Sequence, residues 1–105
     1  IGLSYKVIIG DNAANVRIGP DGTTTKLTGS INVASDVAAK TLYRAIPVGS
    51  THVSLSHAEQ EKGGVSGSLI EFFYNSATGV TVLGTVLCDH ESPSGTELFG
   101  TGDIG

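Results

Sequence analysis

The sequence contains one cysteine, no methionine, no tryptophan and only six Lys or Arg residues. The lone Cys88 excludes an intrachain disulfide. A nucleic-acid backbone is bound by clustered positive charge, whereas these basic residues are scattered and the net charge is −4 at pH 7. No apolar run approaches the roughly 18 residues of a transmembrane helix. The sequence therefore argues against a nucleic-acid partner and against a membrane span.

Methionine is missing even from the first position, which is Ile1. An initiator Met is normally removed only before a small residue, so this start suggests either that a signal or pro-segment has been cleaved or that the start of the sequence has been edited. We therefore expect an exported protein, either extracellular or displayed on a virion or cell surface.

Charged residues are also scarce, at 15% of the chain against roughly 25% in an average domain. Gly, Ser and Thr occupy 37 of the 105 positions, a mixture that suits strands and turns and is poor in strong helix formers. A chain of this length is expected to form a single domain, residues 1–105, with one core of two packed layers.

Alternation of apolar and polar residues predicts the fold class. In the segment 80–88 one parity is apolar and is expected to face the core: Val80, Val82, Val86 and Cys88. About seven such segments, spaced roughly 8–12 residues apart and separated by turn residues, predict an all-β, mainly antiparallel fold. We expect a small β-sandwich or barrel with at most one short helix.

Turn residues predict how two pairs of strands connect. The sequence GPDG predicts a hairpin of 16–18 with 24–33, in which Gly29 marks a bulge in the second arm. The sequence NSATG, residues 75–79, predicts a second hairpin connection, in which Gly79 takes a positive φ.

The segment 34–46 fits either a helix or a strand. Ser35 or Asp36 suits a helix N-cap, and Pro47 suits the end of a helix. We favour one or two helical turns followed by an extended piece toward Val48.

The sequence VLCDHESPSGTELFG, near the C-terminus, concentrates the residue types of catalytic and metal sites. Parity directs Cys88 into the core, and no basic neighbour in the sequence lowers its pKa, so it is a poor candidate nucleophile. Cys88 and His90 would need a further ligand to hold zinc. His52 and His57 fall on opposite faces of one strand, so at most one of them joins. No known catalytic motif occurs, and we expect no enzyme.

Acidic residues follow Cys88 on sequence that is typical of loops. Those that suit Ca²⁺, a hard cation that prefers oxygen ligands, are Asp89, Glu91 and Glu97, with Asp103 beyond them. No EF-hand or repeat spacing accompanies them. A solvated acidic loop is the favoured interpretation, and calcium is the alternative cofactor.

A second apolar face accompanies the one that is expected to form the core. It carries four large residues: Leu69, Phe73, Leu83 and Leu87. Apolar patches of this kind are normally covered. The segment 37–45 is one candidate cover, and a neighbouring subunit is the other.

Charge is distributed unevenly along the chain. All six Lys and Arg residues lie within residues 1–62, whereas residues 63–105 contain five acidic residues and no basic one. This asymmetry suggests a dipolar subunit whose acidic end approaches Lys6, Arg17 or Lys26 of the next copy.

Together these features favour a non-enzymatic β subunit that assembles with copies of itself into a filament, coat or virion-type structure. The alternative is a small secreted lectin or adhesion domain that binds carbohydrate, with or without calcium, through the loops 75–79 and 89–97. Tyr74, beside the first loop, is its best aromatic contact. The segment 98–105 is open to three interpretations: a tail, an edge strand or a strand donated to a neighbour.

Overall fold

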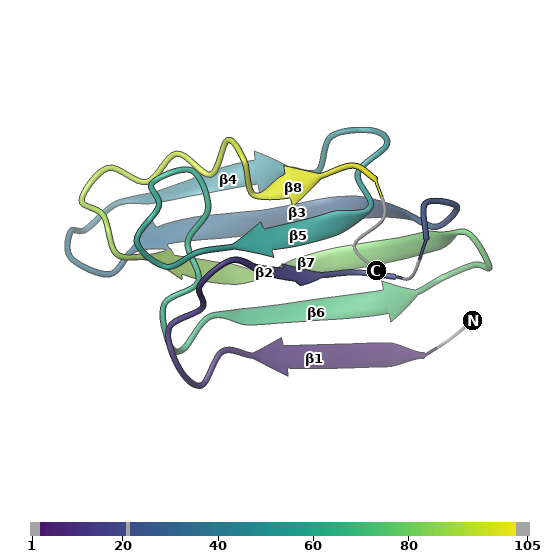
Figure 1. Cartoon of the computed structure of the whole chain (residues 1–105), viewed down its shortest axis with the longest axis horizontal. Helices are drawn as coiled ribbons and strands as arrows, with labels where there is room; N and C mark the ends of the chain where they lie inside the picture. The colour runs from purple at the N-terminus through teal and green to yellow at the C-terminus, as the bar shows by residue number, and fades with distance from the viewer. Residues whose placement is uncertain (1–2, 21, 103–105) are drawn as a thin grey trace.

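The computed structural model describes residues 3–20 and 22–102, which form eight strands and no helix (Figure 1). Five strands form one sheet in the order β1-β6-β7-β3-β4, and three form a second in the order β2-β5-β8. The strands are β1 (Ser4–Ile8), β2 (Val16–Ile18), β3 (Lys26–Ser35), β4 (Thr41–Ala45), β5 (His52–Leu55), β6 (Leu69–Tyr74), β7 (Gly79–Cys88) and β8 (Phe99–Gly100). The predicted all-β class is confirmed.

All the strand pairs are antiparallel except one. β3 runs parallel to β7, with Leu27 beside Val80 at one end and Ser35 beside Cys88 at the other. Parallel neighbours need a long connection. Here the chain between β3 and β7 forms β4, crosses to the second sheet as β5, and returns as β6.

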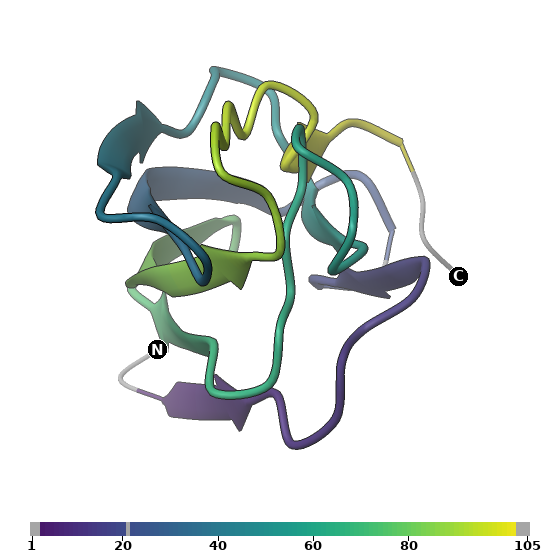
Figure 2. The ribbon, with the colours of Figure 1, turned by 90° about the vertical axis from the view of Figure 1, so that its left-hand side faces the viewer.

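The core lies between the two sheets, which face each other in Figure 2. It consists mainly of the side chains at every second strand position, which the sequence predicts to face inward. The fully buried members from the large sheet are Leu27, Ile31, Val33, Ile70, Val80, Val82, Val86 and Cys88. Val53, Leu55 and Leu98 complete it from the other side. Each such side chain contributes about 1.5–3 kcal/mol through burial, so period-two patterning dominates the stability of this fold.

The hairpin predicted for 16–18 with 24–33 is wrong. β2 pairs with β5, so that Val16 lies beside Leu55 and Ile18 beside Val53. β3 instead belongs to the other sheet. The Gly and Pro residues after β2 predict a turn, but they do not determine which strand pairs with β2. Asp21 lies outside the described residues.

The helical turns favoured at the start of 34–46 do not form. Ser35 does act as a cap: its Oγ accepts hydrogen bonds from the backbone N–H of Val37 (3.2 Å) and Ala38 (2.9 Å). Its own N–H donates to the carbonyl of Lys40 (2.8 Å), so the cap closes the tight loop between β3 and β4. The alternation in β4 is hidden in the sequence because Arg44 occupies an inward position, where its Nε donates to the carbonyl of Ser94.

Two glycines behave differently from their predictions. The register between β3 and β7 is the same on both sides of Gly29, so no bulge forms there. Gly29 has a φ of 109°, and a Cβ at this position would collide with the carbonyl oxygen of Val82. The hairpin between β6 and β7 forms as predicted, with Tyr74 beside Val80. Gly79 opens β7 in this hairpin without a positive φ.

Candidate functional site

The candidate site is the surface of the five-stranded sheet that points away from the core, here called the outer face. Its side chains meet across the strands in direct pairs, with Glu71 beside Leu83 and Leu69 beside Thr85. On the other side of β6, Lys6 pairs with Glu71 and Ile8 with Leu69. Leu69, Phe73, Leu83 and Leu87, which the sequence places on one face, all belong to this surface.

The apolar side chains of the outer face reach solvent. Leu83 is 45% exposed, Ile8 is 67% exposed and Tyr43 is 66% exposed. Leu69, Phe73 and Leu87 are half-buried by their neighbours in the sheet. Ile8 and Tyr43 lie on the two edge strands of the sheet, β1 and β4. The sequence pattern does not indicate that these two side chains share a face with Leu83.

The predicted cover for this face is absent from the described residues. The segment 37–45 is the loop before β4 and then β4 itself, which lies beside β3 as an edge of the same sheet. A strand in the plane of a sheet leaves both faces of that sheet open. In Figure 2 no other described strand lies beyond the outer face.

The predicted basic contacts do not share one surface. Lys6 lies on the outer face, in β1. Arg17 lies in β2, opposite Ser54 of β5, and therefore belongs to the second sheet. The sequence alone does not separate them, because the assignment of β2 to the second sheet depends on long-range pairing.

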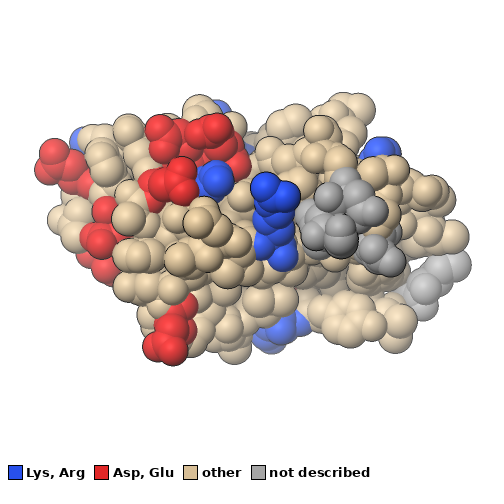
Figure 3. Space-filling model, in the orientation of Figure 1, with Lys and Arg blue, Asp and Glu red and all other residues tan. Residues whose placement is uncertain are grey.

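Two acidic loops lie side by side at one end of the molecule. The N–H of Glu97 donates to the carbonyl of Glu61 (3.0 Å), and that of Asp89 donates to the carbonyl of His57 (3.0 Å). Figure 3 shows the acidic side chains gathered toward this end. Within residues 3–20 and 22–102, no three His, Cys, Asp or Glu side chains form a group that suits a metal ion. The structure therefore does not bring Asp89, Glu91 and Glu97 together as calcium ligands, and Asp103 lies outside the described residues.

Cys88 faces the core, as its parity predicts, and is fully buried. Its Sγ donates to the carbonyl oxygen of Glu59 at 3.3 Å. Burial raises the pKa of the thiol above its usual value, and the nearby carboxylates of Asp89 and Glu61 raise it further. The thiolate that a nucleophile or a zinc ligand needs is therefore disfavoured. His90 is engaged elsewhere, since its Nδ1 accepts from the N–H of Ser92 (3.0 Å).

His52 is buried on β5, between β2 and β8. Its Nδ1 lies 3.2 Å from Oγ1 of Thr51. Burial lowers the pKa of this imidazole below its usual value, and the positive charge of Arg17 adds to the effect; a hydrogen bond to the backbone of Gly102 partly opposes both. The second histidine considered for zinc, His57, has a buried Nδ1 with no hydrogen-bond partner among the described residues.

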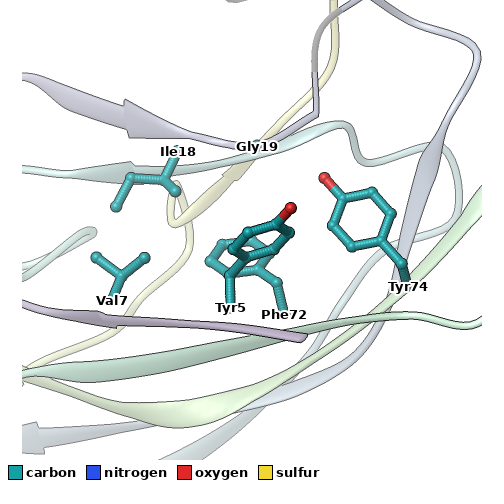
Figure 4. Close-up of a pocket in the computed structure, with 6 residues that line it drawn as sticks. All are labelled: Tyr5, Val7, Ile18, Gly19, Phe72 and Tyr74. Carbon is teal, nitrogen blue, oxygen red and sulfur yellow. The ribbon is translucent and has the colours of Figure 1, made fainter. Parts of the chain in front are cut away.

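A pocket opens between the two sheets, on the side where β1 and β2 are edge strands (Figure 4). Its volume is about 260 Å³, and its lining is Tyr5, Val7, Ile18, Gly19, Phe72 and Tyr74. Tyr5 and Tyr74 meet edge to face, with ring centroids 5.7 Å apart and ring planes at 82°. The sequence analysis identifies Tyr74 alone, because the other residues come from strands whose proximity has no local signature.

Comparison with known proteins gives no assignment: no protein-family model matches the chain, and no curated protein or solved structure is significantly similar to it. A search of the described residues for a helix that is long and apolar enough to cross a bilayer finds none.

Proposed function

We propose that the chain is a non-enzymatic structural subunit that assembles with further copies of itself through the outer face of its five-stranded sheet. The observation that carries this proposal is the exposure of Ile8, Tyr43 and Leu83 on one continuous sheet surface that no described segment covers. Exposed large apolar side chains that share one face of a sheet mark a candidate contact site.

Flat apolar sheet faces associate by stacking. Two sheets that pack face to face lie about 10 Å apart with their side chains interdigitated. Each buried square ångström of apolar surface contributes roughly 25 cal/mol before the entropic cost of association. The half-buried Leu69, Phe73 and Leu87 would complete their burial in such a contact.

Charge on the outer face favours a two-fold arrangement. Lys6 and Glu71 are direct neighbours across β1 and β6. When two identical faces stack about a two-fold axis, residue contacts are reciprocal. Lys6 of each copy can then approach Glu71 of the other, which aligns the two faces.

The environment of Cys88 supports a non-enzymatic role. It is the chain's sole thiol, it lies in the core, and its pKa is raised by burial. A nucleophile needs the opposite environment, with an accessible sulfur and a lowered pKa.

Intermolecular paramagnetic broadening tests the proposed contact. A spin label is attached to Ser4→Cys, at an exposed outer-face position of β1, while the buried Cys88 remains unlabelled. Labelled protein is mixed with isotope-labelled, unmodified protein. The expected result is broadening of the amides around Leu69 and Leu83.

A label at Val48→Cys is the matched control, because Val48 is fully exposed in the turn between β4 and β5, off the outer face. It should produce much weaker broadening of the outer-face amides. Broadening centred on β2 and β5 from the Ser4→Cys label, or none at any concentration, would reject the proposed contact.

A further inference from the structure

The pocket between β1 and β2 is lined by residues that do not belong to the outer face. The large sheet supplies four lining residues whose side chains point toward the second sheet: Tyr5, Val7, Phe72 and Tyr74. Ile18 lies at the end of β2 in the small sheet, and Gly19 follows it. The pocket lies between β1 and β2, which are edge strands of the two different sheets.

Close backbone approach keeps one wall of the pocket free of side chains. A Cβ at Gly19 would lie 2.5 Å from the carbonyl oxygen of Thr51, so only glycine fits here. Gly19 therefore contributes backbone alone, beside the side chain of Ile18.

The lining combines an apolar floor with a polar rim. Val7, Ile18 and Phe72 supply carbon surface, and none of the described lining residues is charged. In Figure 4 the phenol oxygens of Tyr5 and Tyr74 point toward one another. Each can donate or accept a hydrogen bond. A ligand with an apolar body and one uncharged polar group would satisfy both parts.

Size and polarity distinguish between ligand classes. The volume of about 260 Å³ lies below the roughly 300–1,000 Å³ of sites for drug-sized molecules, so one ring fits and an extended ligand does not. A sugar ring carries several hydroxyls, whereas only two side-chain hydroxyls line this pocket, so most of the sugar's hydrogen bonds would be left unmade. A charged ligand would lose its hydration without gaining a counter-charge.

From these features we propose that the pocket binds a single uncharged aromatic ring bearing one hydroxyl group, as in a phenol. The ring lies on the carbon surface of Phe72 and Ile18, edge to face with Tyr5, and its polar group bonds to the tyrosine hydroxyls. Edge-to-face contacts of this kind already occur between Tyr5 and Tyr74. The proposal does not depend on self-assembly.

An amide chemical-shift titration with p-cresol tests the proposal. Saturable shifts are expected at Ile18, Gly19 and Phe72. Benzoate, with a charge in place of the hydroxyl, should bind at least about tenfold more weakly. Methyl glucoside should give no saturable shift. Saturable binding of the glucoside, or equal binding of benzoate and p-cresol, would overturn the assignment to an uncharged aromatic ring.

Three variants locate the binding. Tyr5→Ala removes a 56% exposed ring and should weaken p-cresol binding by about tenfold. Val7→Phe fills the pocket and should abolish saturation. Tyr43→Ala, which removes the exposed tyrosine of the outer face, is the matched control and should leave the affinity unchanged. Unchanged affinity in both Tyr5→Ala and Val7→Phe, with the native spectrum retained, would reject the pocket as the site.

Discussion

Glu71 on β6 lies directly beside Leu83 on β7, so an exposed leucine of the outer face has a carboxylate as its cross-strand neighbour. On its other side, Glu71 faces Lys6 of β1. The outer face therefore carries a pair of opposite charges beside its exposed apolar side chains. This pattern can limit the orientations in which two copies stack.

Reversing one charge should weaken self-association. Lys6→Glu places two carboxylates on neighbouring strands and removes the cation that would meet Glu71 of a second copy. Charge pairs of this type contribute roughly 0.2–1 kcal/mol, so we expect an association constant lower by about 1.4- to fivefold. Sedimentation equilibrium measures the change.

The double reversal Lys6→Glu with Glu71→Lys is the control for this prediction. It restores opposite charges both within one copy and between two stacked copies, and should recover most of the lost association. Association that is equally strong in the wild type, in Lys6→Glu and in the double reversal would remove the role of charge in orienting the contact.

Gly29 should be irreplaceable for steric reasons. Its φ of 109° is unfavourable for other residues, and a Cβ would meet the carbonyl oxygen of Val82 on β7. Gly29→Ala should lower the free energy of unfolding by about 2 kcal/mol or more. Gly10→Ala, where a Cβ meets nothing within 4 Å, is the control and should change it by less than about 0.5 kcal/mol. Denaturant melts compare the two, and equal effects would contradict the proposed collision.

Cys88 should react only when the protein opens. The thiol is fully buried, and burial with two nearby carboxylates raises its pKa above 9.0, its usual value. Reaction with a disulfide reagent at neutral pH should be more than about a hundredfold slower in the native protein than in denaturant. A rapid reaction in the native state would show that the sulfur is accessible, and would reopen its use as a nucleophile.

Acidification should destabilise the fold through His52. Its pKa in the native state is lowered from 6.5, chiefly by burial and then by Arg17, so the unfolded chain binds a proton at a higher pH than the native one does. The neutral His52 side chain therefore costs the fold no stability above about pH 6.5. The free energy of unfolding falls as the pH drops from there through the native pKa of His52.

Denaturant melts between neutral and mildly acidic pH, on the wild type and on His52→Gln, isolate this contribution. The variant should show a smaller loss of stability on acidification. A histidine NMR titration of the wild type provides a check that does not depend on the variant. A midpoint for His52 at or above 6.5 would contradict the proposed environment.

The alternation of apolar and polar residues along single segments was sufficient to predict that the chain is rich in strands and which strand positions face the core. Val80, Val82, Val86 and Cys88 point inward because each strand exposes one parity to the core, a property that depends only on spacing. The same spacing placed Leu69 and Leu83 together on the opposite face. The turn between β6 and β7 was also local, since only residues 75–78 connect these two neighbours in the sheet.

Long-range pairing was not predictable from the sequence. The parallel pairing of β3 with β7 joins residues that are far apart in the chain. The alternation of apolar and polar residues in β3 would be the same whichever strand it paired with, so the pattern does not identify the partner. The pocket was missed for the same reason, because Tyr5 and Ile18 come from different sheets. In β4, the inward Arg44 interrupted the apolar alternation that would have marked a strand.

The proposal that the outer face joins copies of the chain is tested most directly by measuring the mass of the protein in solution, with and without Leu83→Glu. Light scattering over a range of concentrations should show assemblies for the wild type and monomers for Leu83→Glu, because a buried carboxylate without a partner opposes stacking. Val48→Glu, which changes a fully exposed valine away from the outer face, should assemble like the wild type. A wild type that stays monomeric at every concentration, or a Leu83→Glu variant that assembles unchanged, would contradict the account.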